Sequence, residues 1–194
     1  HAFSSFSSSG FNKALCIVVD GSGSLTPQAS FLTETESIFE ASYKKGFKTL
    51  HKMFRQYDDK TPPSIGQCYR LISKLLGFPS LGGPGKVMGL SSYGKYNNKI
   101  PKILINYKGN PKIFKPSRTD YIDTISDLFN ISNFSKYKED TAFHLQKDSE
   151  EEIIKLIKLA LSQSNIKNIC CSGGYFLNCV ANYRLKKEFP NINF

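Results

Sequence analysis

Three glycine-rich segments carry the residue types that a phosphate or nucleotide site needs. They are residues 20–24 (Asp-Gly-Ser-Gly-Ser), 82–85 (Gly-Gly-Pro-Gly) and 172–174 (Ser-Gly-Gly). Glycine allows backbone N–H groups to approach an anion closely and to adopt positive φ. We expect a helix directly after residues 172–174, and its N-terminus would favour phosphate. One such turn is usually plain strand-to-helix geometry, but three in one chain make a nucleotide site an equally good interpretation.

These turns match neither of the two best-known nucleotide-binding signatures. The chain has no G-x-x-x-x-G-K-[ST] sequence, and no G-x-G-x-x-G falls at a strand–helix junction. A nucleotide site in this chain would therefore be of another class. Actin and the sugar kinases build such a site from separated glycine turns.

Histidine and cysteine by themselves give little support for a metal centre. The three histidines, His1, His51 and His144, lie far apart, and the five cysteines show no C-x-x-C pair and no zinc spacing. We expect His51 and His144 to be structural. Free cysteines in apolar segments behave as small hydrophobes, and reduced thiols are typical of the cytoplasm. The sequence therefore predicts a cytoplasmic protein without a structural zinc site.

The formal net charge of +10 is the one unusual global property. The lysines are spread along the chain and only four arginines occur, whereas phosphate forks and base recognition favour arginine. A solvated lysine-rich surface is therefore a better interpretation than a nucleic-acid surface. The composition, with 40% hydrophobic and 22% charged residues, is that of a globular domain. No apolar run approaches the roughly 20 residues of a membrane span.

The elements that would position these turns alternate between strand and helix. An apolar run at residues 14–19 predicts a buried strand, and residues 35–42 and 46–54 predict a hairpin. A helix should begin at a Ser64 cap and end at Gly77.

The second half of the chain continues the alternation. Asp148 is predicted to cap a new helix, because acids follow it, and residues 166–171 are predicted to form a strand. A helix should then run to Glu188, with another strand starting at Ile192. This order suits an α/β layer fold with helices packed on a mixed sheet. The weak stretch at about 95–138 is predicted to be an insertion, with a hairpin near 102–115 and a helix near 120–130.

Three longer segments carry more specific motifs. Residues 1–5 and 14–21 read H-A-F-S-S and A-L-C-I-V-V-D-G. Residues 64–78 run from S-I-G-Q-C-Y to L-L-G-F, and residues 85–94 read G-K-V-M-G-L-S-S-Y-G. Residues 171–182 read C-S-G-G-Y-F-L-N-C-V-A-N. Together, in this order and spacing, they resemble the carbamoyltransferase family, whose members modify nodulation factors, tobramycin and cephamycins.

The resemblance implies an α/β domain of the actin and sugar-kinase (ribonuclease H-like) superfold, related to the universal tRNA threonylcarbamoyl-adenosine enzyme. Such a domain has a layered mixed sheet with flanking helices. It transfers a carbamoyl group from carbamoyl-adenylate to a hydroxyl of a small-molecule or sugar acceptor. A separate C-terminal domain makes the adenylate from carbamoyl phosphate and ATP. We expect residues 1–194 to be the central part of the N-terminal domain, incomplete at both ends and inactive alone.

The resemblance also implies a metal site. His1 matches a metal-binding histidine of the family, and Asp20 matches an acidic residue that can join the same divalent metal, expected to be iron. The remaining ligands would lie outside this chain. Without the resemblance, His1 would be interpreted as a solvent-exposed terminal residue and Asp20 as a turn residue.

A nucleotide site is implied in the same way. Gly173, Gly174 and Asn178 match the turn that receives adenosine, which would otherwise be a plain turn with Asn178 on a helix surface. Lys86 would balance phosphate charge, although an exposed surface lysine is nearly as good an interpretation. The residues expected to approach the phosphate from the opposite side are Gly21, Ser22 and Gly23.

Two other functions stay open at this point. A tRNA threonylcarbamoyl transferase would share the superfold and suit the positive charge, although G-K-V-M-G-L and L-N-C-V-A-N favour the small-molecule family. A nonenzymatic nucleotide-binding module would keep the glycine turns without the chemistry. No general base can be assigned. The main prediction requires residues 20–24 and 172–178 to face one cleft sized for an adenylate.

Overall fold

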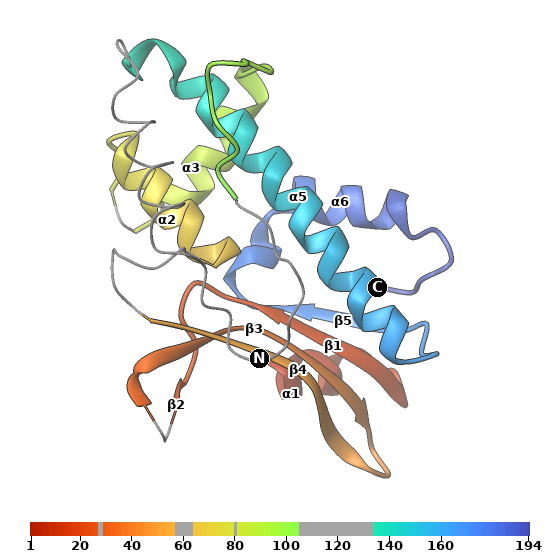
Figure 1. Ribbon diagram of the computed structural model, residues 1–194. Coiled ribbons are helices and arrows are strands. Elements are labelled where there is room, and N and C mark those ends of the chain that lie inside the picture. Colours follow the sequence, from red (N-terminus) through yellow and green to blue (C-terminus); the bar gives the residue numbers. More distant parts are fainter. Residues whose placement is uncertain (27–28, 57–63, 80, 105–133) are drawn as a thin grey trace.

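A mixed five-stranded sheet forms one layer of the computed structural model, which describes residues 1–26, 29–56, 64–79, 81–104 and 134–194 (Figure 1). Its strands are β1 (Lys13–Val19), β2 (Leu25–Thr26), β3 (Ala29–Ser42), β4 (Gly46–Gln56) and β5 (Ile169–Ser172). Strand β3 pairs antiparallel with both β1 and β4, and the short β2 pairs with the first part of β3. Strand β5 lies parallel to β1 on the other side of β1. The carboxyl ends of β1 and β5 therefore meet at the same edge.

Helices cover both faces of this sheet (Figure 1). The bounds are α1 (Ala2–Ser8), α2 (Ile65–Leu75), α3 (Gly83–Leu90), α5 (Lys138–Gln163) and α6 (Cys179–Glu188), with 3-10 turns η1 (Ser91–Tyr93), η2 (Phe134–Tyr137) and η3 (Gly174–Leu177). Helix α1 packs on one face, and α2, α3, α5 and α6 form a layer on the other. No helix within the described ranges is both long and apolar enough to cross a membrane.

Strand β1 is buried on both faces because its side chains alternate between two cores. Leu15 and Ile17 pack into the large core beneath the helical layer. Ala14 and Cys16 point the other way, into a smaller core that Phe6 of α1 completes. A central strand covered on both sides reads as a continuous apolar run, as the sequence of β1 does.

Most predicted elements are confirmed. The fold class is the predicted α/β class, a layered mixed sheet with flanking helices. The predicted hairpin is β3 and β4, both longer than predicted, and Gly46 has a φ of 70° where β4 begins. Ser64 caps α2: its hydroxyl accepts the N–H of Gln67 at 3.1 Å, and the Gln67 side chain accepts the N–H of Ser64 at 3.1 Å.

The prediction that a helix begins at Asp148 is wrong. Helix α5 begins at Lys138, ten positions earlier, and Asp148 lies within it. The Asp148 carboxylate is buried and accepts the N–H groups of Ile103 at 2.7 Å and Leu104 at 3.1 Å. The acids that resembled a helix start are therefore placed there by long-range partners.

Three further boundaries differ from prediction. The segment after Gly173 forms the 3-10 turn η3 before α6 begins at Cys179. Only Gly82, with a φ of 77°, is a turn residue in the second glycine segment, because α3 begins at Gly83. Asn193 makes an isolated bridge to Asn168 instead of the strand predicted from Ile192. The predicted hairpin near 102–115 and helix near 120–130 lie almost wholly at residues 105–133, outside the described residues.

Candidate functional site

The candidate site lies where β1 and β5 end side by side. Asp20 follows β1, and Gly173 follows β5 with a φ of 98°. A Cβ at Gly173 would lie 2.3 Å from the carbonyl oxygen of Val19. Only glycine therefore lets the two strand ends approach so closely.

Helix α2 adds a third chain segment at this point. A Cβ at Gly66 would lie 2.6 Å from the nitrogen of Gly21, so the first turn of α2 rests directly on the backbone after β1. The buried carboxylate of Glu36, on β3, accepts the N–H of Ile65 at 3.1 Å. An acid at a helix N-terminus is favoured by the free N–H groups and the helix dipole. Glu36 thus ties α2 to the sheet beside the Asp20 turn.

A cavity of about 500 Å³ opens between these segments. Its size is in the range of small-molecule and cofactor pockets. All three glycine-rich segments contribute to it, so the predicted common cleft for the turns after β1 and β5 is present. The lining residues are Asp20, Gly21, Gly66, Tyr69, Arg70, Gly82, Pro84, Gly85, Met88, Gly174, Tyr175, Leu177 and Asn178.

The structure brings together some of the predicted nucleotide-binding residues and not others. Gly21, Gly174 and Asn178 line the cavity. Ser22, Gly23, Lys86 and Gly173 are not among the lining residues: Lys86 is exposed on α3, and the N–H of Gly23 is bound to the carbonyl of Glu34 at 2.7 Å. Gly173 acts behind the cavity wall, by allowing the close approach to Val19.

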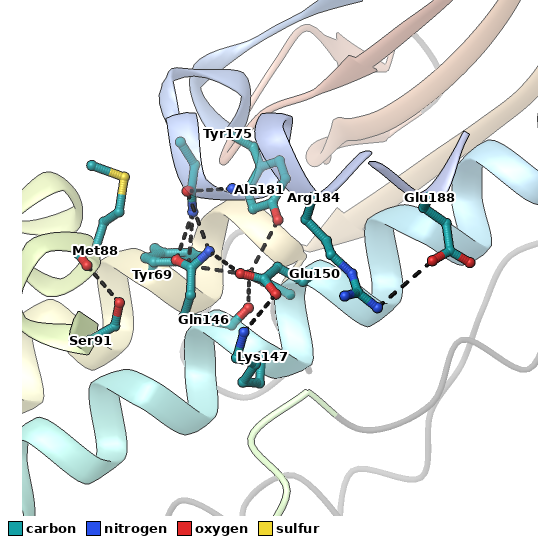
Figure 2. Close-up of polar contacts among 12 residues, drawn as sticks. Tyr69, Met88, Ser91, Gln146, Lys147, Glu150, Tyr175, Ala181, Arg184 and Glu188 are labelled. Atoms are coloured by element: carbon teal, nitrogen blue, oxygen red, sulfur yellow. Dashed lines mark hydrogen bonds and ion pairs between the residues drawn. The ribbon is translucent and has the colours of Figure 1, made fainter. Parts of the chain in front are cut away.

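Asn178 is not on a helix surface, as a plain turn would have placed it. Its side chain is buried and caps α6, where its Oδ1 accepts the N–H of Ala181 at 3.1 Å. Its Nδ2 donates to the Tyr69 hydroxyl at 3.1 Å and to Oε1 of Gln146 at 2.9 Å. Figure 2 labels these two partners. The amide is therefore fixed at both ends by protein partners.

His1 and Asp20, predicted as metal ligands, lie together. The His1 Nε2 is 3.0 Å from Oδ2 of Asp20, and the other carboxylate oxygen accepts the N–H of Gly21 at 2.7 Å. Imidazole nitrogen and carboxylate oxygen suit a first-row divalent metal such as iron. Among the described residues no third His, Cys, Asp or Glu completes a group of three. The pair fits a metal as two of its ligands.

Sequence reasoning missed the wall that α2 contributes. Gly66, Tyr69 and Arg70 all line the cavity from one side of this helix. Their spacing of three and four residues is the signal that could have found them, because such positions share a helix face. Arg70 and Asp20 are the two charged side chains among the lining residues. The predicted structural roles of His51 in β4 and His144 in α5 agree with their buried positions.

Burial controls the protonation of the two tyrosines at the wall. It raises the pKa of the hydroxyls of Tyr69 and Tyr175 well above the ordinary value for tyrosine. Both hydroxyls therefore stay protonated and contact side chains on α5, at 2.6 Å from Tyr69 to Gln146 and 3.2 Å from Tyr175 to Ser149.

Comparison with known proteins bears directly on this arrangement. Residues 1–193 match the family described as carbamoyltransferase N-terminus. An uncharacterised protein of Synechocystis is 27% identical over 99% of this chain and 32% of its own length. A tRNA N6-adenosine threonylcarbamoyltransferase of Persephonella marina is 29% identical over 75% of this chain and 39% of its own length. The chain spans roughly a third of the length of these relatives.

Two solved structures are similar at TM-scores just below 0.5. One is the activator of 2-hydroxyisocaproyl-CoA dehydratase from Clostridium difficile, solved with ADPNP bound, with a TM-score of 0.48, 11% identity and coverage of 93% of this chain and 52% of that chain. The other is component A of (R)-2-hydroxyglutaryl-CoA dehydratase from Acidaminococcus fermentans, with a TM-score of 0.49, 10% identity and coverage of 97% and 56%.

Proposed function

Because this chain belongs to the family of carbamoyltransferase N-termini, we propose that its cavity binds carbamoyl-adenylate and that its domain transfers the carbamoyl group to a hydroxyl of a small molecule or sugar. One observation carries the proposal. The turns after β1 and β5, which the family motifs mark, line a single cavity together with Asp20. That cavity is large enough for a nucleotide.

The reaction asks mainly for placement and charge stabilisation, because carbamoyl-adenylate is a mixed anhydride with AMP as a good leaving group. The acceptor oxygen attacks the carbamoyl carbon, and the bond from that carbon to the phosphate oxygen of AMP breaks. AMP keeps the electron pair, and the hydroxyl proton goes to a general base. Gly21 and Gly174, after the neighbouring carboxyl ends of β1 and β5, would let backbone groups come close to the phosphate.

His1 and Asp20 would hold the divalent metal of this site, with iron as the proposed metal. A bound metal ion would stabilise negative charge on a phosphate or carbamoyl oxygen. The protein's own contribution is to fix the two ligands: the Gly21 N–H holds one oxygen of Asp20 and leaves the other directed at His1.

The whole protein would need further parts. We propose that carbamoyl phosphate and ATP are converted to the adenylate by a C-terminal domain of the same protein, in the cytoplasm. All five cysteines are free, which suits a reducing compartment.

Two glycines of α3 offer a direct test of the cavity. Gly85 lines it and Gly89 does not, and a Cβ at either position would meet no atom within 4 Å. Gly85→Leu should fill part of the cavity, whereas Gly89→Leu is the matched control on the same helix. Overpacking typically costs about 1–3 kcal/mol, so AMP affinity should fall roughly five- to hundredfold in the first variant alone.

The measurement is calorimetric titration of AMP into the wild-type chain and both variants at constant salt. Equal weakening by both leucines, or no binding of AMP to the folded wild-type chain, would reject the proposed cavity.

A second candidate function is favoured by the relative from Persephonella marina. A tRNA threonylcarbamoyl transferase would use the net charge of +10 to bind its substrate. Tight tRNA binding that falls steeply with salt would support this candidate, because each neutralised phosphate releases counterions. Weak binding of tRNA and of an unrelated RNA with equal affinity would favour the small-molecule acceptor.

A further inference from the structure

A buried polar cluster lies behind the cavity wall, where three residues of α5 outside the family motifs meet two residues within them. It consists of Gln146, Ser149 and Glu150 on α5, together with Tyr69 from α2 and Asn178 from the turn before α6. Figure 2 labels Gln146, Glu150 and Tyr69 of this cluster. Each of these five residues is at least nine-tenths buried. Buried polar groups of this kind are expensive unless every one is bonded, and a fully bonded cluster selects a single arrangement.

Glu150 fixes the orientation of the Gln146 side-chain amide in this cluster. An ionised carboxylate can only accept hydrogen bonds. It accepts from Nε2 of Gln146 at 2.9 Å and from the ammonium of Lys147 at 3.1 Å. The amide nitrogen of Gln146 must therefore face Glu150, and its oxygen must face the opposite way.

The oxygen of Gln146 is the acceptor that joins two walls of the cavity. It receives the hydroxyl of Tyr69 at 2.6 Å and Nδ2 of Asn178 at 2.9 Å. Because the Asn178 nitrogen is held there, its oxygen is directed at the N–H of Ala181, the cap of α6. Tyr69 and Asn178 both line the cavity, from different elements.

We propose that Gln146 and Glu150 are positioning residues that hold Tyr69 and Asn178 at a fixed separation and so set the width of the nucleotide cavity. Neither residue lines the cavity, and both act through Tyr69 and Asn178. The expected change in nucleotide affinity rests on the proposed function. The orientation of the Asn178 amide can be tested independently of that function.

The test exchanges the residue types at positions 146 and 150. Gln146→Glu alone places a second carboxylate beside that of Glu150 and removes the donor between them, which is unfavourable in a buried site. The double variant Gln146→Glu/Glu150→Gln restores all but one of these bonds: the new carboxylate accepts from Tyr69, Asn178 and the new amide, whose oxygen accepts from Lys147. The exception is the long 3.4 Å contact from Nε2 of Gln146 to Oδ1 of Asn178. Glu151→Gln, at an exposed neighbouring position on α5, is the matched control.

Two readouts separate this proposal from the proposed function. The first is AMP affinity, expected to fall roughly ten- to hundredfold in Gln146→Glu, as for a lost hydrogen bond to a charged group, and to return to within about threefold of wild type in the double variant. The second is the side-chain amide signal of Asn178 in ¹H–¹⁵N NMR spectra, assigned by its loss in Asn178→Asp. This signal should be displaced in the single variant and restored in the double variant.

The outcomes distinguish failure of the proposed function from failure of the positioning role. If the wild-type chain does not bind AMP, the proposed function fails while the NMR signal still tests the positioning role. If Gln146→Glu does not fold, the double variant tests the positioning role. That role predicts that the double variant folds, binds AMP with wild-type affinity and gives a wild-type Asn178 signal. A double variant that lacks both, or a folded single variant that keeps both, overturns the positioning role.

Discussion

The two oxygens of the Asp20 carboxylate have different partners. One accepts the N–H of Gly21 at 2.7 Å, and the other lies 3.0 Å from Nε2 of His1. The first bond fixes the rotation of the carboxylate, so the second oxygen stays directed at the imidazole. Both side chains are partly exposed to solvent, so their attraction adds little to stability.

Replacing either member of this pair should remove metal binding. Asp20→Asn keeps the shape of the side chain but removes the negatively charged carboxylate as a metal ligand. His1→Ala removes the imidazole. Even partners one step removed from a metal change its affinity by about 10–100-fold, so each variant should lose at least about tenfold in affinity for Co²⁺ as a probe. The measurement is the visible absorption of bound Co²⁺ during titration of the chain.

Glu151→Gln serves as the control, because it removes an exposed carboxylate elsewhere on the surface. Cobalt binding that survives both Asp20→Asn and His1→Ala would show that these two residues are not ligands.

At the scale of elements, close packing at glycine decides the geometry of the site. Helix α2 can rest on the turn after β1 only because Gly66 has no Cβ to meet the nitrogen of Gly21 at 2.6 Å. Gly66→Ala should therefore destabilise the fold by about 1–3 kcal/mol, as overpacking against backbone does. Gly89→Ala, in open space on α3, should instead stabilise it by up to about 1 kcal/mol.

Urea unfolding of the two alanine variants measures this contrast, with equal slopes required for the comparison. Gly66→Ala should also weaken AMP binding, since it moves α2 away from Gly21. A stability gain in both variants would contradict the close packing of Gly66 against Gly21.

The elements that could be predicted are those with local signals. The Ser64 cap and the glycine at the start of β4 act within a few residues, so their sequence alone was sufficient. Helix α1 was not predicted because four of its seven residues are serine, and its stability comes from Phe6 in the core beneath the sheet. The start of α5 was misplaced because Asp148 has partners more than forty residues away.

The candidate site divides in the same way. Asp20, Gly174 and Asn178 lie in motifs and could be predicted, and the structure places them in one cavity. Tyr69 and Arg70 were missed as lining residues although their spacing from Gly66 places them on one face of α2, because only the packing of α2 on the sheet turns that face toward the cavity. Asn178 was predicted as a nucleotide contact, but its bonds to Gln146 depend on a helix 32 positions away in sequence.

At the scale of the whole molecule, α5 connects the site to the far end of the helical layer. One side of α5 carries Gln146 and Glu150, which face the cavity wall (Figure 2). Another carries Asp140, His144 and Asp148, spaced by four residues along one stripe. These three accept backbone N–H groups from the segment between α3 and residue 104. The same helix therefore fixes both the cavity and this connecting segment.

This second stripe makes stability depend on pH. The Nε2 of His144 accepts the N–H of Asn97 at 3.0 Å, so the bond requires the neutral imidazole. Burial lowers the pKa of His144 below its ordinary value, and also that of His51, although nearby carboxylates oppose the shift. The unfolded chain then binds more protons than the folded chain as pH falls through about 6.5. Stability is fully present above that pH and decreases below it.

His144→Gln should weaken this dependence, because a glutamine oxygen can accept the same N–H without titrating. Urea unfolding at about pH 7.5 and about pH 5.5, on either side of the ordinary histidine pKa, measures the loss for wild type and variant. Burial raises the pKa of Asp148, and that shift acts in the opposite direction at lower pH. Asp148→Asn in both backgrounds removes this opposing contribution, and because the Asp148 charge also raises the pKa of His144, the loss due to His144 should then be larger. A wild-type chain equally stable at both pH values, or a variant with an undiminished loss, would mean that the Asn97–His144 bond does not couple protonation to folding.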